Sequence, residues 1–233
     1  MFYILDSSDF FSFLTVGLIA FHSIASLCFL TVASASQFIA FPSLNSANSN
    51  NTVVLVLFFA SVVIADTLLC SNYQSTFDFS FYTQFIQVIM LIALGIFFLV
   101  SVHYTRIKQI LSFEYSLIIN LSVLGLVLIN VSNDLLTFYI AIELQSLCFY
   151  VLATYNKSSS FSTEAGIKYF ILGALTSVLL LISFVLIYSA FGSMSFEVIE
   201  RCFSASHSLL AFFGCMFFSF AMFFKLGAFP FHA

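Results

Sequence analysis

Seven long apolar runs occupy most of this sequence, and each is close to the length of a membrane-spanning helix. Such a helix needs roughly 20 mostly apolar residues to cross about 30 Å of hydrocarbon. The runs lie at approximately 10–34, 52–70, 81–103, 113–131, 135–155, 165–190 and 207–231. Because 62% of the residues are hydrophobic and 7% are charged, the chain has too few polar side chains to cover a soluble domain. We therefore predict an all-α polytopic membrane protein with about seven transmembrane helices.

The composition also excludes several functional classes. Six basic residues in 233 cannot form the basic stripe of a nucleic-acid-binding protein. The five cysteines have no CxxC spacing and mostly lie in apolar runs, so we predict neither disulfides nor a metal site. The chain has no glycine-rich phosphate loop, no HExxH helix and no paired mid-span histidines for a haem. We therefore expect no cofactor and no redox chemistry in this chain.

The basic residues near the span ends are distributed asymmetrically. Arg106 and Lys108 lie between the third and fourth spans, and Lys157 lies between the fifth and sixth. The opposite side carries one basic residue, Arg201, and six acidic residues: Asp6, Asp9, Asp78, Asp134, Glu197 and Glu200. The positive-inside rule then places the amino terminus and the even-numbered connections opposite the inner compartment.

Two charged residues lie at membrane depth, where they are costly. Glu143 is near the middle of the fifth span. Lys225 follows the apolar segment 209–224, which as a helix covers only about 24 Å and therefore does not reach the far surface. Such groups cost at least about 2.5–3.5 kcal/mol on insertion scales and usually face a partner or a water-filled cavity. We predict that Glu143 and Lys225 interact, either in proton transfer or as a static ion pair that joins two helices.

Polar residues at helical spacing surround Glu143. Tyr139, Ser146, Tyr150 and Thr154 share one face of the fifth span with it. This polar stripe (Tyr139, Glu143, Ser146, Tyr150 and Thr154) can line a hydrogen-bonded path. Its members can equally form interhelical hydrogen bonds, and for Tyr150 and Thr154 both interpretations remain open.

Two further features flank these spans. Lys168 lies about one turn inside the sixth span, four residues after Glu164. It fits both a favourable i,i+4 pair at the interface and a proton-carrying role. Gly227 and Pro230 follow Lys225, and Pro230 is incompatible with a continuous helix, so we predict that the seventh helix breaks there. Broken helices at membrane depth are typical of ion-transport sites.

Three sequence blocks resemble one family. They are SNDLLT with IELQSL at 132–147, EAGIKYFILGA at 164–174 and FKLGAFPFH at 224–232. Together, in this order and spacing, they resemble subunit 2 of proton-pumping NADH:ubiquinone oxidoreductase, respiratory complex I. The resemblance covers about residues 110–233, whereas the first three spans match only in hydropathy. Hydropathy places three amino-terminal transmembrane helices in 1–108, and the resemblance implies helices four to seven of an incomplete antiporter-like inverted repeat in 109–233.

The resemblance also implies site residues and a mechanism. Glu143, Lys225, Lys168 and His232 match the charged and histidine positions that line a hydrated half-channel and a central charged axis in the family. An ionised Glu143 near Lys225 would stabilise the protonated amine. If Glu143 is neutralised or moves away, desolvation would dominate and Lys225 would release its proton along the axis.

The family context supplies the remaining expectations. The complex would use NADH, FMN, iron–sulfur clusters and ubiquinone in other subunits, and would lie in the mitochondrial inner membrane or in a bacterial plasma membrane. The family continues beyond the PFH motif, whereas this sequence ends at Ala233. We therefore expect the amino-terminal fragment of a split subunit, with a second polypeptide packing against spans four to seven.

Two other functions are compatible with the same residues. A subunit of a multi-subunit cation/proton antiporter would share the fold. A membrane scaffold with relict buried charges would also contain Glu143 and Lys225 without using them. The sequences of the 164–174 and 224–232 blocks favour complex I over the antiporter subunit.

Overall fold

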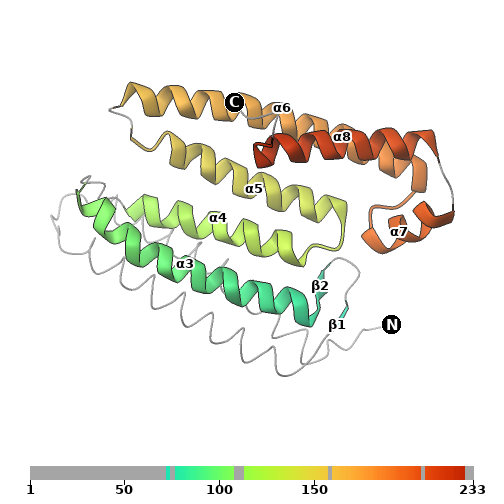
Figure 1. The fold of residues 1–233 in the computed structure, drawn as a ribbon, viewed down its shortest axis with the longest axis horizontal. Helices are drawn as coiled ribbons and strands as arrows, with labels where there is room; N and C mark the ends of the chain where they lie inside the picture. The colour runs from blue at the N-terminus through green and yellow to red at the C-terminus, as the bar shows by residue number, and fades with distance from the viewer. Residues whose placement is uncertain (1–71, 74–76, 108–112, 157–158, 206–207, 229–233) are drawn as a thin grey trace, which may run out of the picture. The chain divides into compact units, whose positions relative to one another are not determined.

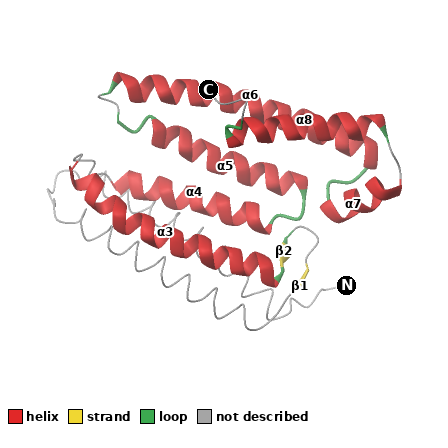
Figure 2. Cartoon of the chain, viewed as in Figure 1, coloured by secondary structure: helices red, strands yellow, loops and turns green. Residues whose placement is uncertain are grey.

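A computed structural model describes residues 72–73, 77–107, 113–156, 159–205 and 208–228. The predicted spans at 10–34 and 52–70, and with them part of the seven-span prediction, lie outside these residues. The chain divides into two compact units, with the boundary between Val131 and Ser132 apart from a short exchange around residues 75–77. In the described residues both units are mainly helical (Figures 1 and 2).

Among its described residues, the first unit contains two apolar helices and a small strand pair. Helix α3 spans Phe81–Ile107 and α4 spans Phe113–Val131. These helices confirm that the predicted segments 81–103 and 113–131 are helical. Strands β1 (Asn72–Tyr73) and β2 (Asp78–Phe79) pair antiparallel, with Asn72 opposite Phe79. The Asn130 amide donates a 2.8 Å hydrogen bond to the Thr83 carbonyl and links α4 to the first turn of α3.

In the part that the structure describes, the second unit contains four helices. They are α5 (Leu135–Ala153), α6 (Ser160–Phe191), α7 (Phe196–Ala205) and α8 (Leu209–Leu226). By length and composition, α5, α6 and α8 are long and apolar enough to cross a membrane. Helix α6 packs against both α5 and α8. The predicted spans at 135–155, 165–190 and 207–231 are thus recovered as three helices, the last of them ending at Leu226.

Helix α6 is longer than the sequence pattern indicates. Its 32 residues extend about 48 Å, well beyond the hydrocarbon thickness. It begins five residues before the predicted start, so Thr163 and Glu164 lie inside the helix. Hydropathy identifies only the apolar part of a helix, so it does not detect the polar turns at the start of α6.

Helix α7 was not predicted. It is a short amphipathic helix in which Glu197 and Arg201 are exposed. On its apolar side Ile199 packs against the core of the unit, and the rings of Phe203 and Phe191 lie 5.2 Å apart. Ten residues with interspersed charges do not reach spanning length, and the segment was therefore interpreted as a connection.

The core of the second unit joins α5, α6 and α8. Its fully buried members are Leu135, Leu180, Phe184, Ile187 and Ala221. Phe138 of α5 and Phe184 of α6 both contact the ring of Phe218 on α8, at centroid distances of 6.3 and 6.1 Å. The three helices therefore share one apolar core on one side of α6.

Backbone and hydroxyl hydrogen bonds hold both ends of α5. At its start, the amide of Leu135 donates to the carbonyl of Met194 and the amide of Phe196 donates to the carbonyl of Asn133, both at 3.0 Å. At its end, the Ser162 hydroxyl donates a 2.7 Å hydrogen bond to the carbonyl of Ala153. Helix ends leave unpaired backbone groups, and here segments adjoining α6 pair them. Helix α5 is thereby held in a fixed position along α6.

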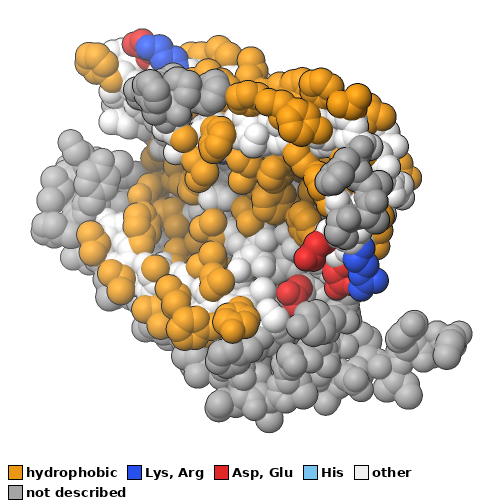
Figure 3. All heavy atoms as spheres, turned by 45° about the vertical axis from the view of Figure 1, so that its right-hand side comes forward, with side chains coloured by type: hydrophobic (Ala, Val, Ile, Leu, Met, Phe, Trp, Pro, Cys, Tyr) orange, Lys and Arg blue, Asp and Glu red, His pale blue; other side chains and the backbone are white. Residues whose placement is uncertain are grey.

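Most of the described surface is apolar, as expected for helices in lipid. In Figure 3, charged side chains occur in small groups between broad apolar areas. Exposed charged residues are found near the start of α6, at Glu164 and Lys168, and on α7. Helix α8 exposes large apolar side chains along its length, including Leu209, Phe212 and Phe223.

Close contact between α5 and α6 depends on a glycine. The phenol oxygen of Tyr150 lies directly where a Cβ on Gly173 would be, and the ring carbon Cε1 is 2.9 Å from that position. Tyr150 is buried at this contact. Any side chain at residue 173 would therefore push the two helices apart or displace the Tyr150 ring.

We predict that Gly173→Leu lowers the free energy of unfolding by about 1–3 kcal/mol, because it overpacks the α5–α6 contact. Denaturant unfolding of the purified chain in detergent measures the loss. The control is Ala174→Leu, which adds a similar side chain at the neighbouring exposed position. Combining Gly173→Leu with Tyr150→Ala should cost less than the sum of the single changes. Strict additivity would contradict the predicted clash.

Candidate functional site

Glu143 lies near the centre of α5 and is bound by side chains of its own helix. The Ser146 hydroxyl donates a 2.9 Å hydrogen bond to Glu143 Oε2. The Tyr139 hydroxyl makes a longer contact of 3.5 Å with Oε1. The helical spacing of these three residues, one turn before and one turn after Glu143, produces this arrangement. Both oxygens of the carboxylate are therefore contacted from α5 itself.

Lys225 lies in the last turn of α8, and its amine is buried. Its Nζ has no hydrogen-bond partner among the residues that the structure describes. The helix ends one residue later, where Gly227 adopts a left-handed conformation with φ of 63°. The amide of Ala228 then donates to the carbonyl of Phe223 at 3.0 Å, which is the hydrogen bond of a Schellman cap. A lysine at this position also interacts favourably with the negative end of the helix dipole.

The end of α8 refines the predicted helix break. Helix α8 ends at Leu226, and its cap Gly227 lies three residues before Pro230, to which the sequence analysis attributes the break. Pro230 and His232 lie outside the described residues. The physical cause within the described part is the positive φ, which glycine adopts without the steric cost of a Cβ.

The structure places Glu143 and Lys225 in the same helical unit without pairing them directly. They interact electrostatically between α5 and α8. Their side chains do not form an ion pair, since Nζ lacks a hydrogen-bond partner in the described part of the chain. A buried amine and a carboxylate are thus within electrostatic range, and the carboxylate is bound elsewhere.

The polar stripe of α5 faces α6. The ring of Tyr139 meets Phe184 edge-on at 6.1 Å, and its hydroxyl interacts with the side chain of Ser177. Further along, Thr154 lies against Gly166. The prediction that these residues share one face is confirmed, and that face packs on the small residues of α6.

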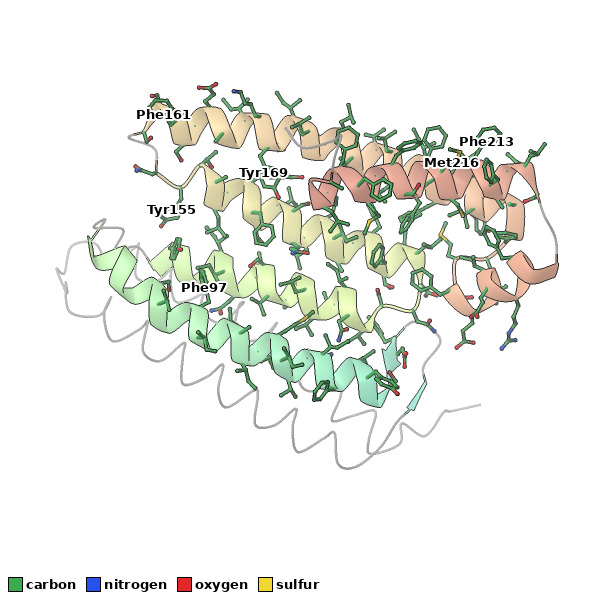
Figure 4. The ribbon with its side chains drawn as sticks, in the orientation of Figure 1. Phe97, Tyr155, Phe161, Tyr169, Phe213 and Met216 are labelled. Atoms are coloured by element: carbon green, nitrogen blue, oxygen red, sulfur yellow. The ribbon has the colours of Figure 1, made fainter. Side chains whose placement is uncertain are left out.

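Tyr150 connects the stripe to aromatic residues of α6. Its ring lies 4.9 Å from Tyr169 and 5.6 Å from Phe170, close to perpendicular in both cases. Tyr169 projects from α6 toward α5 in Figure 4. The Ser146 side chain interacts with the Tyr150 hydroxyl. Tyr139, Glu143, Ser146 and Tyr150 therefore form one continuous polar row.

Sequence reasoning missed Ser177 and Tyr169 as neighbours of this row. A usable signal exists, because Tyr169, Gly173 and Ser177 recur every four residues and so share one face of α6. Only their apposition to the stripe requires the tertiary structure.

Lys168 is not part of this group. Its side chain is 70% exposed and pairs with Glu164 at 2.6 Å, one turn earlier on α6. This contact is the i,i+4 pair that the spacing predicts. The proton-carrying role of Lys168 stays a prediction. Within the described ranges, no group of three or more His, Cys, Asp or Glu side chains could hold a metal ion.

Comparison with known proteins identifies relatives of this chain. Residues 132–233 match the sequence profile of the family described as NADH:quinone oxidoreductase/Mrp antiporter, transmembrane. NADH-quinone oxidoreductase subunit N of Pelagibacter ubique is 40% identical over 150 residues, which are 64% of this chain and 32% of the relative. NADH-ubiquinone oxidoreductase chain 2 of Marchantia polymorpha is 37% identical over 158 residues, which are 65% of this chain and 32% of the relative.

A solved structure shows the same fold. Respiratory complex I from Thermus thermophilus contains a chain that superposes with a TM-score of 0.72 and 21% sequence identity, covering 94% of this chain and 45% of that one. The present chain thus spans about a third of the length of the two curated relatives. These relatives are subunits of NADH-quinone oxidoreductase, and residues 132–233 carry the similarity to its antiporter-like transmembrane family.

Proposed function

We propose that this chain is part of a proton-translocating, antiporter-like membrane subunit of NADH:quinone oxidoreductase. The observation that supports this most is the buried Lys225 amine without a hydrogen-bond partner in the described residues, within electrostatic range of Glu143. An ionisable group kept at membrane depth is a functional site by default, because it is costly there. The relatives named above are subunits of NADH-quinone oxidoreductase, and we propose that the buried amine acts in that enzyme.

The proposed mechanism uses the electrostatic interaction between the two residues. An ionised Glu143 close to Lys225 stabilises the protonated amine. When the carboxylate is neutralised or further away, the cost of burying the ammonium dominates and Lys225 becomes a proton donor. Quinone reduction elsewhere in the complex would drive the change. Lys168 and His232 are proposed as further members of the proton path on the basis of the sequence resemblance alone.

The proposal includes partners and location. Other membrane subunits of the complex would contact the exposed apolar faces of the helices. NADH, FMN, iron–sulfur clusters and ubiquinone would bind to other subunits. The mitochondrial inner membrane is the proposed location, supported by the similarity to a chain 2 protein, and a bacterial plasma membrane is the alternative.

One alternative function has a specific observation in its favour. The matching family includes subunits of Mrp antiporters, so the fold is also compatible with cation/proton exchange that is independent of NADH. Co-purification distinguishes the two functions. A complex with NADH oxidation activity supports the respiratory enzyme, whereas NADH-independent sodium/proton exchange in vesicles supports the antiporter.

Lys225→Ala tests the role of the buried amine. We expect fewer protons pumped per electron in membrane vesicles containing the assembled complex, because the variant lacks the proton-binding group. NADH oxidation with a soluble artificial acceptor should be unchanged and reports that the complex is intact. Arg201→Gln, at an exposed position of α7, is the control for removal of a positive charge. Unchanged pumping in Lys225→Ala would support a scaffold without a pumping role.

Glu143→Gln tests the role of the carboxylate. Glutamine keeps the size of the side chain and one acceptor oxygen, but it replaces the other oxygen with an amide donor and removes the charge. We expect proton pumping to fall, because the variant no longer stabilises protonated Lys225, while the amount of assembled complex stays the same. Glu200→Gln, exposed on α7, is the matched control. If Glu143→Gln pumps as the wild type does, the charge of Glu143 is dispensable and the mechanism is wrong.

A further inference from the structure

The Ser146 hydroxyl has two acceptors within reach. One is Glu143 Oε2 at 2.9 Å and the other is the backbone carbonyl of Glu143 at 3.0 Å. A serine hydroxyl carries a single proton, so the two oxygens compete for it. If the carboxylate moves away, the hydroxyl still donates to a carbonyl of its own helix, which is a common bond for serine in a helix.

The Tyr139 hydroxyl also has two polar neighbours. Its hydroxyl contacts Glu143 Oε1 at 3.5 Å, which is at the long limit for a hydrogen bond. The same hydroxyl interacts with the side chain of Ser177 on α6. Tyr139 therefore also keeps a polar neighbour when the carboxylate is absent.

These alternative partners lower the cost of moving the Glu143 side chain. Leaving a buried donor unpaired costs more than a typical hydrogen bond gains. Neither Ser146 nor Tyr139 would be left unpaired if Glu143 turned toward α8. Lys225, whose Nζ has no partner in the part of the chain that is described, would gain one.

We propose that Ser146 and Tyr139 are positioning residues that hold the Glu143 carboxylate on α5 and release it to Lys225 without themselves losing a polar partner. In this structure the carboxylate is bound by Ser146 and contacted by Tyr139, which we call the held position. The inference rests on the proposed proton-translocating function and specifies which side chains compete with Lys225 for the carboxylate. The held position favours the neutral amine of Lys225. In the released position, in which the carboxylate has turned toward Lys225, the protonated amine is favoured.

The groups facing Glu143 limit what a pH measurement can report. Tyr139 and Tyr150 on α5 and Lys225 on α8 interact electrostatically with it. From α6, Ser177 reaches Tyr139 and Tyr169 reaches Tyr150. Tyrosines ordinarily titrate near pH 10. A change in the pH profile below that value therefore does not come from these tyrosines.

The test compares Ser146→Ala and Tyr139→Phe with the wild type in vesicles containing the assembled complex, with proton pumping measured from pH 6 to 9. Both variants weaken the held position, so Lys225 stays paired and protonated to higher pH. We expect the alkaline limb of the profile, which is the pH range over which pumping falls as the pH rises, to shift to higher pH by about half a pH unit or more. Ser146→Thr, which keeps a hydroxyl, should restore the wild-type limb.

Matched controls remove the same groups elsewhere. Ser219→Ala deletes a hydroxyl that donates to the carbonyl of Met216 on α8, and Tyr188→Phe deletes a phenol on an exposed side of α6. Neither should move the limb. If Ser146→Ala fails to assemble, Tyr139→Phe, which keeps the ring, decides the test alone.

The outcomes separate this inference from the proposed function. A limb that stays in place in both variants, with pumping lost in Lys225→Ala, overturns the positioning role and leaves the function intact. Pumping that persists in Lys225→Ala overturns the proposed function itself. A limb that moves in both variants and returns in Ser146→Thr supports the inference.

Discussion

The cost of a charged group in hydrocarbon is the constraint on which the rest of this structure depends. The cost is reduced for Glu143 because its carboxylate accepts hydrogen bonds from hydroxyls one turn away on its own helix. This arrangement requires the polar face of α5 to be covered. Helix α6 covers it by approaching closely at Gly173, where Tyr150 fills the space a side chain would need. For Lys225 the cost of burial is less well compensated, because its buried Nζ has no hydrogen-bond partner among the described residues. The difference between the two residues is the physical basis of the proposed mechanism.

Packing in the second unit serves both stability and the site. One apolar core joins α5, α6 and α8, while the hydrogen bonds to Met194 and from Ser162 fix both ends of α5 along α6. These contacts leave the backbone at the site little freedom to shift. A side-chain rotation of Glu143 is consequently a smaller change than a helix movement. Such a rotation is what the competing acceptors of Ser146 would permit.

Much of this arrangement is predictable from the sequence, for identifiable reasons. The spans 113–131 and 135–155 match α4 and α5 closely, because apolar length and polar punctuation are local properties. Hydropathy missed α7 and the polar start of α6, since neither depends on apolar composition. The stripe on α5 followed from helical spacing alone. Its contact with Ser177 and Tyr169 did not, because periodicity identifies a face of a helix without identifying what covers it.

By itself, the sequence predicted a membrane protein, the apolar segments long enough to cross a membrane, and the two charges that would be costly there. Composition and spacing carry that information directly. The tertiary structure decided that Glu143 is bound by Ser146 and not by Lys225, that the stripe faces α6, and that Gly227 ends α8 beside the buried amine. These features depend on side-chain rotamers, on backbone angles and on contacts between helices far apart in the chain. A pattern of residue types specifies which contacts are chemically suitable, and only packing selects among them.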